Sequence, residues 1–105
     1  MMDRVETNFK VCKLLKDLGD SPAKISKKLR RSGVRGRPRN PKGCPVAQYL
    51  MQNAPPGVKA TSVRGRDVRL IFGKYVKDSF IPLPPAVVEF VDKFDNGKIA
   101  KDLVA

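Results

Sequence analysis

The segment VKATSVRGRDVRLIF, residues 58–72, contains the pattern that sets the fold class of this 105-residue chain. Residues 58–63 and 67–72 are short runs rich in β-branched side chains. Apolar side chains alternate along the second run, as is typical of a strand with one buried face. Arg64-Gly65-Arg66 separates the runs and predicts a hairpin turn in which the glycine supplies a positive φ. The alternating apolar positions of the second strand are Val68, Leu70 and Phe72.

Three helices are expected upstream of this hairpin. Apolar residues at helical spacing predict helices over residues 7–18 and 22–32, with Ser21 as the N-cap of the second, and a third helix that begins at Pro45. Glycines and prolines between them predict a loop over residues 33–43. The side chains expected to face inward on these helices are Val11, Leu14, Leu15, Leu18, Ala23, Ile25, Leu29, Val46, Ala47, Leu50 and Met51.

Downstream of the hairpin, a third strand is expected over residues 75–81, and the prolines that follow lead into a last helix over about residues 85–95. Val87, Phe90, Val91 and Phe94 form its apolar stripe. The chain therefore predicts one α+β domain over residues 1–105. It consists of two to three N-terminal helices, a small antiparallel sheet (a hairpin or three strands) over about residues 58–81, and a closing helix.

The charge is strongly basic and unevenly distributed. Lysine and arginine number 22 against 10 aspartates and glutamates, a formal net charge of +12. Residues 24–42 hold nine cations and no acid, and Asp67 is the one acid between residues 21 and 77. A short charge run is ordinarily a solvated face. At this density, however, like charges destabilise the compact state unless a polyanion lies opposite, and the pattern predicts binding to a nucleic acid backbone.

The composition argues against an enzyme, a metal site or a bound cofactor. There is no histidine, the commonest general base and metal ligand, and no phosphate-cradling GxxxxGK motif. Cys44 precedes a helix but has no histidine to activate it, so it is interpreted as a cap or a buried contact, and Cys12 as a small core residue. No apolar run is long enough to span a bilayer and no secretory signal is present, so the expected location is the cytoplasm.

The sequence Arg35-Gly36-Arg37-Pro38 is the Arg-Gly-Arg-Pro core of an AT-hook. In such a motif an extended backbone enters the minor groove of A·T-rich DNA, and the two guanidinium groups spread along its floor. Glycine is interpreted as the residue that permits this insertion, and proline as the residue that keeps Arg37 extended. The alternative is that Gly33 and Gly36 only end a helix and turn the chain, with the arginines in solvent.

The other candidate DNA contacts lie in the same basic segment or at a repeat of the motif. Val63 to Arg66 repeats the Val-Arg-Gly-Arg sequence of Val34 to Arg37. This repeat is interpreted either as an ordinary hairpin turn, with Asp67 pairing locally, or as a second basic prong on phosphate. The predicted DNA-binding residues are Arg35, Gly36, Arg37, Pro38, Arg39, Lys42, Lys24, Lys27, Lys28, Arg31, Arg64 and Arg66.

Two resemblances bear on this interpretation. The order helix, glycine, extended Arg-Gly-Arg, proline, helix over about residues 21–53 is similar to the DNA-binding domains of actinobacterial nucleoid silencers, although residues 39–43 form a spacer that those domains lack. The stretches GVRGR (33–37), CPVAQYL (44–50) and IPLPP (81–85) resemble small uncharacterised proteins of actinobacteria and their phages. The first resemblance implies minor-groove binding, and the second implies a bacterial nucleoid or a phage-infected cell as the location.

The expected partner is therefore A·T-rich double-stranded DNA, and no membrane partner is expected. The alternative is a protein-interaction module or inhibitor, encoded by a phage or its host, whose basic face docks an acidic surface of a host protein. RNA ranks third among the expected partners. Proteins that bind single strands stack bases on aromatic side chains, and the densest basic segment has no aromatic residue. The sequence leaves open the oligomeric state, where a dimer would add avidity, and whether the turn at 64–66 faces the loop at 33–43.

Overall fold

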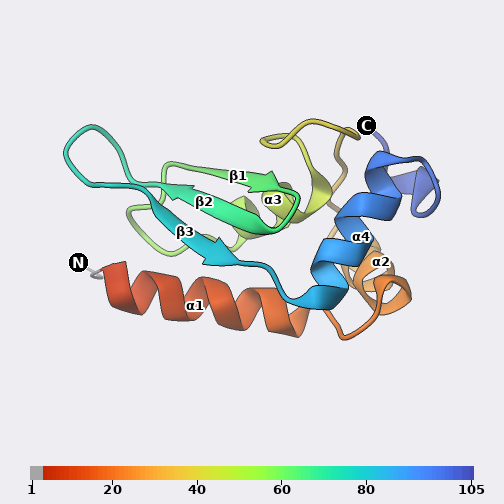
Figure 1. The fold of residues 1–105 in the computed structure, drawn as a ribbon, viewed down its shortest axis with the longest axis horizontal. Helices are drawn as coiled ribbons and strands as arrows, with labels where there is room; N and C mark the ends of the chain where they lie inside the picture. The colour runs from red at the N-terminus through yellow and green to blue at the C-terminus, as the bar shows by residue number, and fades with distance from the viewer. Residues whose placement is uncertain (1–3) are drawn as a thin grey trace.

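The computed structural model describes residues 4–105 and confirms the α+β class. Three helices precede a three-stranded antiparallel sheet, and one helix follows it (Figure 1). The elements are α1 (Arg4–Asp17), α2 (Pro22–Arg31), α3 (Pro45–Gln52), β1 (Ala60–Arg64), β2 (Asp67–Ile71), β3 (Ser79–Pro82), α4 (Pro85–Asp95) and the 3-10 turn η1 (Lys101–Leu103).

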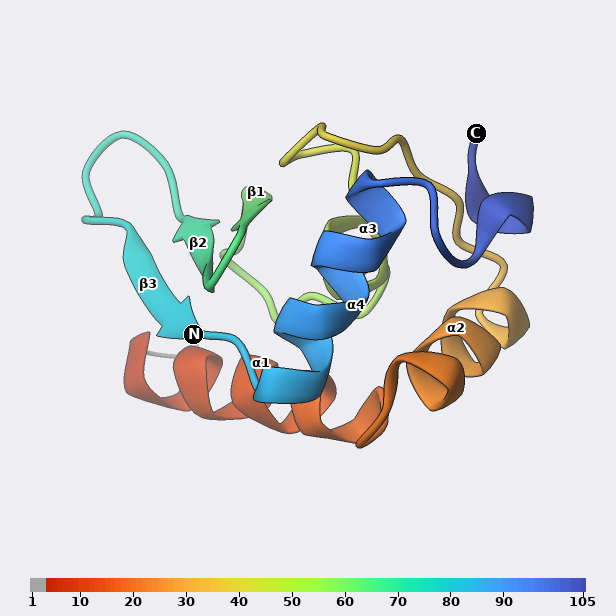
Figure 2. The ribbon, with the colours of Figure 1, turned by 45° about the vertical axis from the view of Figure 1, so that its right-hand side comes forward.

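The sheet has the strand order β1-β2-β3, and helices cover one of its faces. Gly65 and Arg66 connect β1 to β2, and Val68 and Leu70 of β2 are fully buried. On the buried side, α3 packs against β1, and α1 runs along β3 (Figure 1). In Figure 2, α4 lies between the sheet and α2, and it packs against α2. The core therefore lies between the sheet and the four helices, and the loop after α2 carries exposed arginines.

Local sequence explains where α2 begins and ends. The Ser21 hydroxyl accepts a hydrogen bond from the Lys24 backbone N–H at 3.3 Å, and Pro22 occupies the first turn, as predicted. Gly33, just beyond the last turn, has a φ of +74°, a conformation that glycine adopts without steric cost.

Two residues predicted to face inward do not. Ala23 is exposed, because the buried stripe of α2 is centred on Ile25 and Leu29, one turn apart. On α3, Met51 is 37% exposed and Tyr49 takes its place in the core. The buried face of α3 contains Val46, Tyr49 and Leu50, which have the i, i+3, i+4 spacing of one helix face.

The strand boundaries also differ from the prediction. The third strand covers residues 79–82 rather than 75–81, and Phe72 lies just outside β2. The ladder between β2 and β3 begins at the pair Leu70 and Ser79, and β2 ends one residue further, at Ile71. Residues 72–78 therefore form a loop with no strand opposite them. The first strand is likewise displaced, to residues 60–64.

Candidate nucleic-acid interface

Residues 33–43, here called the basic loop, are fixed in place by hydrogen bonds to the C-terminal residues. The Gly36 N–H donates to the Leu103 carbonyl, and the Gly36 carbonyl accepts from the Ala105 N–H, both at 2.8 Å. Together they form an isolated parallel bridge between Gly36 and Val104. The Arg37 N–H donates to the Gly43 carbonyl across the loop, also at 2.8 Å.

The far part of the basic loop is anchored to β1 and α4. The Pro41 carbonyl accepts from the Val63 N–H of β1 at 2.9 Å. The Arg39 N–H donates to Asp95 Oδ1 of α4 at 2.9 Å, and this contact helps hold Arg39 at a φ of +58°. A non-glycine residue at positive φ needs such support, and hydrogen bonds therefore hold the basic loop at both its near and far parts.

Gly36 has an internal role that differs from the one predicted for it. It is buried, and a Cβ atom on it would collide with the Gly43 carbonyl oxygen and lie 2.5 Å from the Pro45 nitrogen. Its own N–H and carbonyl are both hydrogen-bonded to the C-terminal residues. Glycine is therefore required here for close approach of backbone to backbone, and the Gly36 backbone is not free to enter a DNA groove.

The side chains on either side of Gly36 remain exposed. Arg35 and Arg37 are separated by one residue of extended backbone, so they project to the same side while Gly36 faces the protein. Arg35 lies near Asp102, and its charge contributes to a lowered pKa of that carboxyl. The main cause of the lowered pKa is Arg30, which makes a two-hydrogen-bond ion pair with Asp102 at 2.5 and 3.0 Å.

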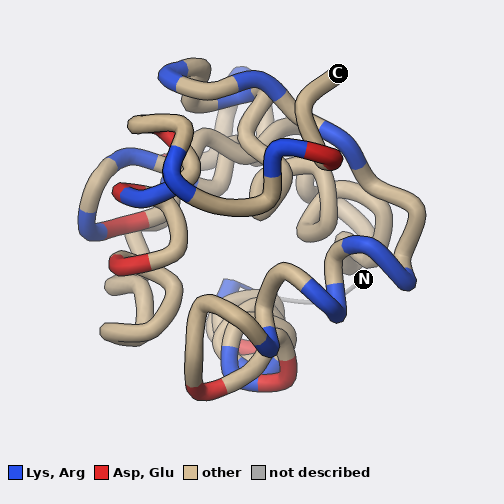
Figure 3. The backbone as a smooth tube through the Cα atoms, turned by 90° about the vertical axis from the view of Figure 1, so that its right-hand side faces the viewer, with Lys and Arg blue, Asp and Glu red and all other residues tan. Residues whose placement is uncertain are grey.

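The outward side of α2 carries three exposed lysines and an exposed arginine, Arg31. Lys27, Lys28 and Arg31 are exposed, and within residues 4–105 they belong to no ion pair. Lys24 is exposed too, but it pairs with Asp20 at 2.9 Å. In Figure 3, blue segments follow α2 and continue along the loop after it, whereas several acidic segments gather on the opposite side of the view.

The structure brings the hairpin turn next to the basic loop. Besides the hydrogen bond from Val63 to Pro41, Arg39 and Arg64 line one small pocket of about 360 Å³, together with Asp95. Gly65 does not have a positive φ, and a Cβ atom on it would meet no other atom within 4 Å. The predicted reason for a glycine in this turn is therefore wrong, and the fold places no steric demand for glycine there.

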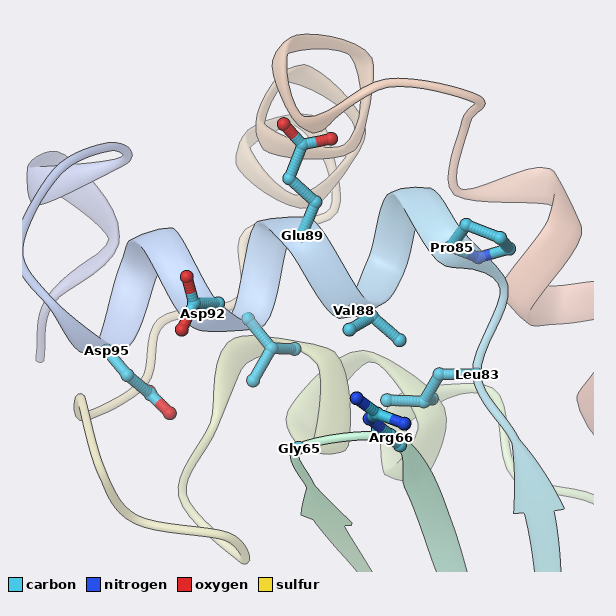
Figure 4. A pocket seen from close by; sticks show the side chains of 9 residues that line it. Gly65, Arg66, Leu83, Pro85, Val88, Glu89, Asp92 and Asp95 are labelled. Carbon is cyan, nitrogen blue, oxygen red and sulfur yellow. The ribbon is translucent and has the colours of Figure 1, made fainter.

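Arg66, at the same turn, faces an acidic surface. It lines an open pocket of about 700 Å³ together with three carboxylates of α4, Glu89, Asp92 and Asp95 (Figure 4). Glu89 pairs with Lys93 at 3.1 Å. Carboxylates near Arg66 lower the positive potential on this side of the turn, although Glu89 points away from Arg66 in Figure 4. Arg66 is therefore less suited to a DNA backbone than the cations of α2.

The two cysteines pack in or against the core. Cys44 is the N-cap of α3 and is 2% exposed, and burial raises the pKa of its thiol to about 11. Cys12 is half-buried against the core. Among residues 4–105, no group of three or more histidines, cysteines and acids could hold a metal ion, and no helix is long and apolar enough to cross a membrane.

Comparisons of the chain with protein-family models, with curated proteins and with solved structures find no match.

Sequence reasoning missed two features of this region. The first is the clamp formed by residues 103–105, which no local pattern signals because it joins segments almost seventy residues apart. The second lies elsewhere on the molecule: Phe9, Tyr75 and Phe80 are aromatic residues that are exposed to solvent. Along β3 the exposed Phe80 lies between the buried Ser79 and Ile81. The alternation predicts that these residues face opposite sides of the sheet, but only the packing of the sheet determines which side is buried.

Proposed function

We propose that this protein is a non-enzymatic DNA-binding protein whose α2 and basic loop bind the duplex. The proposal rests on one observation: among residues 4–105, a series of exposed cations on α2 and the basic loop forms no ion pair, although Arg35 lies near Asp102 and Arg39 beside Asp95. The cations in question are Lys27, Lys28, Arg31, Arg35, Arg37, Arg39 and Lys42. Hydrogen bonds already hold the backbone that carries these cations, so little backbone conformational freedom is lost on binding.

The two arginines beside Gly36 are proposed to read the minor groove through their side chains alone. Alternation along the extended backbone puts the two side chains on one side, and a narrow A·T-rich groove concentrates the negative potential that attracts arginine. Lys27, Lys28 and Arg31 would contact phosphates and set the register. Such a protein would act at the nucleoid of a bacterium or in a phage-infected cell.

Fluorescence anisotropy with A·T-rich and G·C-rich duplexes of equal length, at about 50 to 200 mM salt, tests the proposal. Arg37→Ala is expected to remove the preference for A·T-rich DNA. Lys28→Ala is expected to weaken binding to both duplexes alike and to lower the salt slope by about 1. Equal losses in both variants on both duplexes would exclude the groove contact, and no binding at the lowest salt would exclude DNA as the partner.

A docking surface for an acidic protein is the competing function, and it would also show salt-dependent binding. Poly-glutamate, an acidic chain without a groove or bases, is the matched competitor. If it displaces the duplex at equal charge concentration, the basic surface recognises charge alone.

A further inference from the structure

Two aromatic side chains are exposed to solvent near one end of the sheet. Tyr75, in the loop between β2 and β3, is 91% exposed, and Phe80 of β3 is 63% exposed. Phe80 is paired in register with Arg69 of β2, on the sheet face opposite to the one that α1 and α3 cover. No helix lies over this part of the sheet in Figure 1 or Figure 2.

A cation lies over each of the two rings. Lys74 Nζ lies 5.8 Å from the centre of the Tyr75 ring, and Arg69 Cζ lies 6.0 Å from the centre of the Phe80 ring. Arg69 is also paired with Asp78, which holds its guanidinium group in place. Lys77 adds a further exposed cation to the same loop.

A surface with flat exposed rings and adjacent cations suits a ligand that has both aromatic faces and negative charge. Unpaired bases joined by phosphates have both properties, whereas the bases of a duplex have their faces covered by neighbouring base pairs. An acidic peptide would satisfy the cations but would leave the rings without a stacking partner.

We propose that Tyr75 and Phe80 form a stacking platform for single-stranded nucleic acid, with Lys74 and Lys77 on its phosphates. This site is separate from the duplex surface. In Figure 1 the loop between β2 and β3 lies at the left end of the molecule and α2 lies toward the right, along an axis 38 Å long. The inference therefore stands independently of the proposed binding to duplex DNA.

The chain contains its own reporter for this contact. It has no tryptophan and two tyrosines, and Tyr49 is only 5% exposed. A base stacked on Tyr75 is expected to quench its emission. Titration with a twelve-nucleotide oligo(dT), which stays single-stranded, should therefore give both a rise in anisotropy of the labelled oligonucleotide and a loss of tyrosine fluorescence.

Substitutions at the rings separate stacking from charge. Tyr75→Ala and Phe80→Ala should each weaken oligo(dT) binding about tenfold, equivalent to about 1.4 kcal/mol. Tyr75→Phe should keep the affinity, because phenylalanine also stacks, but should lose the quenching. Both rings are exposed, so we expect these variants to fold, which circular dichroism checks. Phe9→Ala, which removes an exposed aromatic of α1, is the matched control and should bind like the wild type.

Two results would overturn the platform. One is oligo(dT) binding that is unchanged by Tyr75→Ala with Phe80→Ala, which would mean that general charge holds the strand. The other is poly-glutamate binding that depends on the same two rings, which would identify an acidic protein as the ligand. Arg35→Ala with Arg37→Ala should leave the quenching intact even if it abolishes duplex binding, so failure of either site can be recognised by itself.

Discussion

At the scale of single residues, the two Arg-Gly-Arg sequences use their glycines differently. Gly36 is enclosed by the Gly43 carbonyl and Pro45, whereas a Cβ on Gly65 would point into open space. Gly36→Ala should therefore lower the free energy of unfolding by about 1–3 kcal/mol through overpacking. Gly65→Ala should change it by less than about 0.5 kcal/mol.

Urea denaturation of the two variants checks this contrast. If Gly36 served only to let the backbone into a groove, Gly36→Ala would keep the stability of the wild type and lose DNA binding alone. Equal stability of both alanine variants would therefore contradict the internal role assigned to Gly36.

The buried Cys44 thiol predicts a pH dependence of stability. Burial raises its pKa from the ordinary value of 9.0 to about 11, so the unfolded chain releases this proton first as the pH rises. The free energy of unfolding should fall between pH 9 and pH 11 and level off above that, by about 3 kcal/mol in total for this group.

Denaturation curves of the wild type and of Cys44→Ala across this pH range test the prediction. Other groups titrate in the same range, so the difference between the two slopes isolates Cys44. Parallel slopes would show that the thiol ionises equally well in the folded chain.

At the scale of elements, the C-terminal residues hold the basic loop through the Gly36 bridge and hold α2 through the ion pair between Arg30 and Asp102. Hydrogen bonding to Arg30, and then the charges of Arg30 and Arg35, lower the pKa of Asp102. The stability that the pair of Arg30 and Asp102 contributes is therefore fully present at a pH above 3.8, the ordinary pKa of the carboxyl. It is lost as the pH falls through the lowered pKa of Asp102.

Asp102→Asn should consequently loosen the bridge without unfolding the chain. Hydrogen exchange at the Gly36 amide should be faster by up to about fivefold, in keeping with an exposed ion pair. Wild type and variant should converge below the lowered pKa of Asp102. Identical protection of this amide near neutral pH would mean that the pair contributes nothing to the clamp.

At the scale of the whole molecule, the charge is segregated: residues 21–77 hold fifteen cations and one acid, whereas α4 holds three acids and one lysine. With a net charge of +12, self-repulsion should destabilise the folded state at low ionic strength. Raising the salt from about 10 to 200 mM should increase the melting temperature by roughly 5 °C, and a bound duplex should raise it further.

Scanning calorimetry of the wild type beside Lys27→Gln with Lys28→Gln tests this. The variant carries less positive charge, so its melting temperature should depend less on salt. A melting temperature that falls as salt is added would show that surface ion pairs outweigh the repulsion.

The helices and the hairpin were predictable because their causes are local. Ser21 and Pro22 start α2 where predicted, and Val68 and Leu70 alternate into the core. The third strand was predicted too long because its extent depends on where β2 ends. Met51 was predicted to face the core and Tyr49 was not, but the structure shows the reverse. A short helix presents more than one apolar face, and the elements packed around it determine which face is buried.

Amino-acid order alone therefore determined the fold class, the capped helices, the hairpin and the location of the charge along the chain. These follow from periodicity, capping and turn chemistry, which act over a few residues. Only the tertiary structure decided that Gly36 is clamped by Leu103 and Ala105, that the turn at 64–66 meets the basic loop, and that Tyr75 and Phe80 face solvent. Those outcomes depend on contacts between distant segments, whose pairing is set by the packing of the whole core.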